Sequence, residues 1–132
     1  MQIAHMASGP TQKFGNAEKF AAAIQAGKPG TQNLYFDWTQ ALAIEDMWRH
    51  GNPLSYPGEP TPAVRAHMAG LLRRLGPDRI LYGTDMPLSW NLRPREWWTR
   101  TVLPLPLTDD EIKNIADNVP PYVHGARAQG ER

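Results

Sequence analysis

The chain lacks cysteine altogether, so it cannot form a disulfide, and any metal site must use His, Asp, Glu or backbone oxygen in place of thiolate. It also lacks a charge excess, because 14 basic and 13 acidic residues give a net charge of +1. This balance argues against nucleic acid and anionic membranes as partners. No apolar run approaches the ~20 residues of a membrane span. We therefore expect a soluble, cytoplasmic protein with neither of these partners.

Proline and glycine are abundant, at 13 and 11 of 132 residues, which predicts many loops around one core. The longest predicted loop covers residues 43–60, and loops of this length are often functional. Of the five tryptophans, Trp38 lies near the end of the predicted strand 33–39, Trp48 lies in the predicted loop 43–60, and Trp90 follows the predicted strand 80–84. Large amphipathic rings at these places favour contact with a small molecule, so we predict that they line a substrate pocket.

Apolar runs and helical periods alternate along the chain, which predicts three strand and helix units with parallel strands. The capping signals are clearest at Thr61-Pro62 and at Thr108 with Glu111 three residues later. The predicted strands are 2–8, 33–39 and 80–84, and the predicted helices are 14–26, 62–75, 94–101 and 109–119.

Two of the predicted strands lead to residues that can carry chemistry. Asp85 follows the strand 80–84, and His5 lies on the strand 2–8. Parallel strands would bring both residues to one edge of the sheet, where α/β enzymes build their sites. A carboxylate can hold a divalent metal and an imidazole can accept a proton from water, which suits hydrolysis or decarboxylation. The alternatives are that Asp85 caps a turn and that His5 is buried and satisfied by a carbonyl.

Asp37 lies in the middle of the strand 33–39, between Phe36 and Trp38. Because successive strand residues point to opposite faces, its side chain is predicted to turn away from these two rings, toward the interior of a sheet or barrel. Pairing with an arginine is the other interpretation of this residue.

Four segments, in order and over most of the chain, resemble the C-terminal part of the amidohydrolase superfamily. The most similar branch is the metal-dependent TIM-barrel hydrolases related to aminocarboxymuconate semialdehyde decarboxylase. The most specific motif is Gly-Thr-Asp-x-Pro, which ends the third segment. The segments are Ile3–Met6, Asn33–Asp37, Leu75–Pro87 and Leu107–Asn118.

The resemblance implies an α/β fold in which residues 1–124 form the last three units of a (β/α)8 barrel and residues 125–132 form a tail. His5 would lie on the sixth strand and Asp85 on the eighth. In the family, the eighth-strand aspartate binds zinc, manganese or another divalent metal and can handle a proton. The sixth-strand histidine polarises or deprotonates the metal-bound water, or ligates metal itself. Asn118 matches a helix-terminal asparagine whose role looks structural.

The chain departs from the family in having no His-x-His pair on a first strand and no fifth-strand histidine. A barrel takes ~250 residues and a zinc site wants three protein ligands, so the metal site is incomplete in this chain. We interpret the chain as a C-terminal fragment of a metal-dependent hydrolase or decarboxylase acting on a small carboxylate, ester or lactone, and inactive alone. Its partner would be the missing N-terminal barrel half or a second copy. The alternative is a non-enzymatic α/β interaction module that pairs through open sheet edges.

Overall fold

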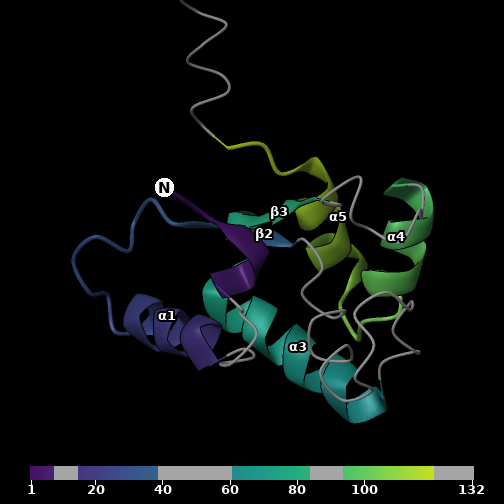
Figure 1. The fold of residues 1–132 in the computed structure, drawn as a ribbon, viewed down its shortest axis with the longest axis horizontal. Helices are drawn as coiled ribbons and strands as arrows, with labels where there is room; N and C mark the ends of the chain where they lie inside the picture. Colours follow the sequence, from purple (N-terminus) through teal and green to yellow (C-terminus); the bar gives the residue numbers. More distant parts are fainter. Residues whose placement is uncertain (8–14, 39–60, 84–93, 121–132) are drawn as a thin grey trace, which may run out of the picture.

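The computed structural model describes residues 1–7, 15–38, 61–83 and 94–120, in which strands and helices alternate (Figure 1). Helices α1 and α3 lie side by side against the sheet, and α5 packs next to β3. No helix in these ranges combines the length and hydropathy that a bilayer span requires. The elements are β1 (Gln2–Ile3), the 3-10 helix η1 (Ala4–Ala7), α1 (Gly15–Gln25), β2 (Tyr35–Trp38), α3 (Pro62–Leu75), the 3-10 helix η2 (Pro77–Arg79), β3 (Ile80–Tyr82), α4 (Pro94–Thr101) and α5 (Asp109–Asp117).

The three strands form one parallel sheet in the order β1-β2-β3, which confirms the predicted α/β class with three parallel strands. Phe36 of β2 pairs with Ile3 on one side and with Ile80 on the other. Strands that follow each other along the chain are therefore neighbours in space, as expected when helices connect parallel strands.

The first strand is shorter than predicted, because it ends at Ile3 and the chain then turns through η1. Met6 and Ala7 adopt φ values of 54° and 56°, in the left-handed region. That region is incompatible with an extended strand. The apolar residues of this segment therefore belong to a buried turn and do not pair in the sheet.

The N-terminal caps of two helices confirm where these helices were predicted to begin, at residues 62 and 109, whereas α5 ends at Asp117, two residues earlier than predicted. The hydroxyl of Thr61 accepts a hydrogen bond from the Val64 backbone N–H at 3.3 Å, which starts α3. At the start of α5, the Thr108 hydroxyl accepts from the Glu111 N–H at 3.2 Å, while the Glu111 carboxylate accepts from the Thr108 N–H at 2.8 Å. Such caps satisfy backbone donors that the helix itself leaves unpaired.

The core lies between the sheet and helices α1 and α3. Phe36 meets Phe20 of α1 edge-on, with ring centroids 5.6 Å apart, and Trp38 is also fully buried. Burial of each such side chain stabilises the fold by roughly 1.5–3 kcal/mol. Burial alternates along β2, so Asp37, which lies between the two rings in the sequence, belongs to the other face of the sheet.

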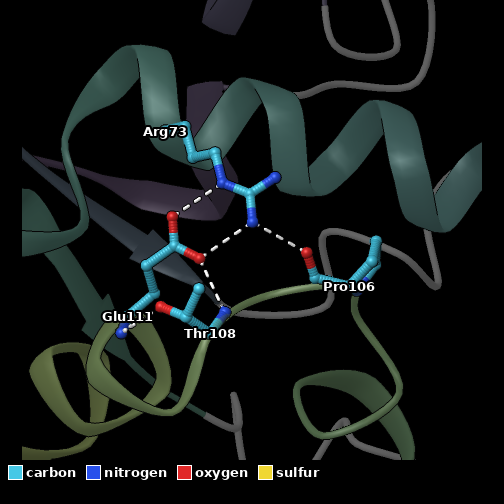
Figure 2. A network of polar contacts seen from close by, with 4 residues as sticks. All are labelled: Arg73, Pro106, Thr108 and Glu111. Carbon is cyan, nitrogen blue, oxygen red and sulfur yellow. Dashed lines mark hydrogen bonds and ion pairs between the residues drawn. The ribbon is translucent and has the colours of Figure 1, made fainter.

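An ion pair joins α3 to the start of α5 (Figure 2). Arg73 donates from Nε to Glu111 Oε1 at 2.7 Å and from Nη2 to Glu111 Oε2 at 2.9 Å, and Nη2 also donates to the Pro106 carbonyl at 2.8 Å. The guanidinium, together with the Thr108 N–H, lowers the pKa of Glu111 to about 2. One carboxylate thus completes a helix cap and ties two helices together.

Candidate functional site

The carboxyl ends of the three strands lie at one edge of the sheet, because the strands are parallel (Figure 1). β1 leads directly into η1, which carries His5 as its second residue, and β3 leads to Gly83. Neighbouring strands are ~4.8 Å apart, so β1 and β3 are roughly 10 Å apart across β2. Asp85 lies outside the described residues, and its predicted meeting with His5 at this edge stays a prediction.

The turn that carries His5 is held in an unusual backbone conformation. Met6 and Ala7, which follow it, are both left-handed, and this conformation costs an L-residue roughly 1–2 kcal/mol. The Met6 side chain is 0% exposed and belongs to the core. Burial of Met6 therefore offsets the strain and fixes the turn. Strained backbone of this kind is found most often at functional sites.

A carboxylate lies next to this turn, on the middle strand. Asp37 alternates with Phe36 and Trp38, which confirms that it turns away from the two rings. Its Oδ2 accepts a hydrogen bond from Gln2 Nε2 of β1 at 3.2 Å, and its Oδ1 is buried. Gln2 is thus one partner of this carboxylate, and its pairing with an arginine stays a prediction. A polar pair consequently bridges β1 and β2 on the face opposite the core helices.

Of the three tryptophans predicted to line a pocket, one lies within the described residues. Trp38 is 1% exposed and packs in the core cluster with Phe36. Trp48 and Trp90 lie outside the described residues. Contact of these three side chains with substrate stays a prediction.

Tyr82 and Trp98 form a contact that the sequence reasoning missed. The ring of Tyr82, the last residue of β3, meets that of Trp98 in α4 edge-on, with centroids 4.9 Å apart. Burial raises the pKa of Tyr82 to about 12, and a backbone hydrogen bond with Trp98 acts in the opposite direction. The pair anchors α4 at the carboxyl end of β3. The sequence offered one indication of this contact, because it has an aromatic residue at the end of a predicted strand and another on the helix that follows.

The opposite end of β3 is held by Asn118, which directly follows α5. Its Nδ2 donates to the carbonyls of Pro77, Asp78 and Ile80 at 3.4, 2.6 and 2.9 Å. The side chain therefore fastens α5 to η2 and to the start of β3, in agreement with the structural role expected for it. The strand that leads toward Asp85 is fixed at both of its ends.

The described residues contain no group of three or more His, Cys, Asp or Glu side chains that could hold a metal ion. Imidazole and carboxylate are suitable ligands for zinc or manganese, so His5 and Asp85 are chemically appropriate. Two ligands fall short of the three that a catalytic zinc site uses. A metal site at this edge therefore requires ligands in addition to this pair.

The chain is similar to a known protein family. Residues 3–118 match the model of a protein family described as amidohydrolase. The matched range begins in β1, contains all three strands and ends just after α5. No curated protein and no solved structure matches the chain.

Proposed function

Because the chain belongs to the amidohydrolase family, we propose that it supplies the last three strand and helix units of a metal-dependent (β/α)8 hydrolase or decarboxylase. Family membership indicates hydrolase-type chemistry. The observation that supports the finer assignment is the parallel sheet, whose carboxyl edge has His5 after β1 and the segment leading to Asp85 after β3. Sites of (β/α)8 enzymes lie at this edge.

In this proposal, Asp85 contributes one ligand to a divalent metal, zinc or manganese, and His5 is the general acid and base. The metal would supply Lewis acidity that lowers the pKa of water and polarises a substrate oxygen. His5 takes up a proton as water attacks and returns it to the departing group. The substrate would be a small carboxylate, ester or lactone, with Trp38, Trp48 or Trp90 at the pocket wall.

The described residues contain no group of three or more ligands, and in this proposal the remaining ligands come from other strands. The described sheet has three strands, whereas a closed barrel of this type has eight. We propose that an N-terminal barrel half, or a second copy of the chain, supplies the missing ligands. β1 and β3 are the outer strands of the described sheet, and an outer strand is a template for further pairing.

Turnover in an assembly that contains all eight strands tests the assignment. With manganese or zinc added, Asp85→Ala should reduce hydrolysis of a panel of small esters and lactones by at least roughly 100-fold, as expected for loss of a metal ligand. Asp110→Asn is the matched control, because it removes an exposed carboxylate in α5, and it should keep full activity. Metal-dependent turnover that survives Asp85→Ala would contradict the assignment.

The chain on its own tests the claim that its site is incomplete. Calorimetric titration with zinc or manganese should show weak binding, because Asp85 supplies too few ligands for a catalytic site even if His5 also contacts the metal. Tight binding of one metal ion by a monomeric chain, checked by size-exclusion chromatography, would contradict that claim. Self-association of the chain without turnover in any assembly would favour the non-enzymatic interaction module.

A further inference from the structure

A single arginine joins the beginnings of β2 and β3. Arg79 is the last residue of η2 and directly precedes β3, whereas residues 31–34 form the turn that enters β2. The Nη1 atom of Arg79 donates to three carbonyls of this turn, those of Thr31 at 2.7 Å, Gln32 at 3.2 Å and Leu34 at 3.4 Å. The contact therefore connects two segments at the edge where the strands begin, opposite the carboxyl edge.

The turn that supplies these carbonyls is held in place on both sides. The Thr31 hydroxyl donates to the Lys28 carbonyl at 2.7 Å, and Thr31 is buried. After the turn, the Tyr35 N–H donates to the Met1 carbonyl at 2.9 Å, which fixes the first residue of β2 beside the start of β1. A guanidinium suits several fixed acceptors better than an ammonium group does, because its donors have a planar, fixed geometry.

The backbone that carries Arg79 is also fixed. Gly76, between α3 and η2, has a φ of 102°, and a Cβ there would lie 2.7 Å from Asp78 Oδ1, so this turn requires glycine. The Arg79 N–H donates to the Gly76 carbonyl at 2.9 Å. Asn118 donates to carbonyls of η2 and β3 from the side of α5. η2 is thus fastened to α5 by Asn118 and to the turn before β2 by Arg79.

The contact of Arg79 lies where the register of β3 is determined. β3 has three residues, and its pairing with β2 joins Phe36 with Ile80, Asp37 with Leu81, and Trp38 with Tyr82. A slip by one residue would turn every side chain of the strand to the opposite face and shift it by ~3.3 Å. So short a strand has few hydrogen bonds of its own to prevent a slip. Asp85 comes three residues after β3 ends, so the register determines where the chain leaves the sheet toward it.

From these observations we propose that Arg79 is a positioning residue, whose guanidinium fixes the register of β3 against β2 and thereby the place at which Asp85 enters the site. Hydrogen bonds from a charged donor are stronger than those from a neutral one, which suits the fixing of a short strand. The inference rests on the metal-ligand role proposed for Asp85. It adds a residue at the beginning of the sheet to those that prepare its carboxyl edge.

Amide hydrogen exchange of the chain as it is, followed by NMR, tests the structural part of this proposal. Arg79→Ala should speed exchange of the N–H groups of β3 and of the turn 31–34 by about tenfold relative to those of α3, as expected for loss of hydrogen bonds to a charged group. Arg79→Lys keeps the charge without the planar donors and should restore only part of the protection. Arg95→Ala, at an exposed position of α4, is the matched control and should change nothing.

Added ethylguanidinium provides a second readout, because it has the atoms that Arg79→Ala removes. It should slow exchange in β3 of Arg79→Ala again, whereas ethylammonium should not. Exchange in β3 that is unchanged in Arg79→Ala, or that rises no more than in α3, would overturn the proposal, because a general loss of stability affects both elements alike. If circular dichroism shows that Arg79→Ala is unfolded, Arg79→Lys takes its place in the same comparison.

Turnover in the assembly with all eight strands tests the consequence for the site. Folded Arg79→Ala should lower kcat by at least about tenfold with little change in KM, because a misplaced ligand impairs the reaction more than substrate binding. An unchanged kcat, in an assembly that loses turnover with Asp85→Ala, would overturn the positioning role. Turnover that survives Asp85→Ala would instead contradict the proposed function, and the exchange result would be unaffected because it needs no metal or substrate.

Discussion

Replacing Glu111 with Gln should reduce the unfolding free energy by about 1–2 kcal/mol at neutral pH, as estimated for the loss of one partly exposed, hydrogen-bonded ion pair. This pair connects α3 to α5. Figure 2 shows the carboxylate between the guanidinium of Arg73 and the backbone of Thr108. Glutamine is also accepted at this position of a capping box. The substitution therefore removes the charge while it keeps a side chain that can still reach the Thr108 N–H.

The magnitude follows from the pKa of Glu111. Its hydrogen bonds from Arg73 and then from the Thr108 backbone lower the pKa from 4.5 to about 2. At ~1.4 kcal/mol per pKa unit, the upper limit is about 3 kcal/mol. The Arg73 side chain is 45% exposed and that of Glu111 is 18% exposed, so water and salt screen the pair. Screening brings the expected loss to about 1–2 kcal/mol.

The pH dependence has a definite sign. A carboxyl group with a lowered pKa in the folded state stabilises the fold fully above its unfolded pKa, here near 4.5. That contribution is lost as the pH falls from about 4.5 to about 2, because the folded protein must then also take up the proton. The difference in unfolding free energy between the wild type and Glu111→Gln should be largest at pH 7 and should shrink steadily below pH 4.5.

Urea unfolding followed by tryptophan fluorescence at pH 7 and at pH 3 measures this difference. Asp110→Asn is the matched control, because it removes one negative charge from the same first turn of α5 at an exposed position. Both variants lose a favourable interaction with the helix dipole, so the excess loss in Glu111→Gln reports the bond to Arg73. The reasoning would be refuted by equal losses in the two variants, or by a loss that is the same at pH 7 and at pH 3.

Two further predictions concern the ends of β3. Asn118→Ala should reduce the unfolding free energy by about 2 kcal/mol, because three carbonyls lose their donor. Asn114→Ala, at an exposed position of α5, is its control, and equal losses in urea unfolding would contradict the role of Asn118. At the other end, Tyr82 should ionise near pH 12, later than an ordinary tyrosine, because burial disfavours the phenolate. Tyr82→Phe should remove the last step of the absorbance titration at 295 nm, and loss of an earlier step would contradict the burial argument.

The helices could be predicted well because their signals are local. The hydroxyl of Thr61 and the pair of Thr108 and Glu111 act on backbone groups only three residues away, and the structure shows the hydrogen bonds that the spacing predicts. The parallel order of the strands could also be predicted, because a helix between two strands leaves few other arrangements.

The contacts that define the candidate site could not be predicted in the same way. Gln2 and Asp37 are 35 positions apart, and Arg73 and Glu111 are 38 positions apart, so no local pattern pairs them. The prediction that the first strand extends to residue 8 was also wrong, because β1 ends at Ile3. The segment after Ile3 is apolar enough for a strand, but the chain turns there with left-handed backbone at Met6 and Ala7, and Met6 is buried in the core.

The alternation along β2 links the core to the candidate site. Because Phe36 and Trp38 face the helices, Asp37 must occupy the other face, where Gln2 of β1 meets it. The rings stabilise the strand that positions the carboxylate, so a large ring at Trp38 contributes to the site even without contact with a substrate. The chemistry of this face therefore depends on the polar residue between the two rings, Asp37, and on Gln2, which donates a hydrogen bond to its carboxylate.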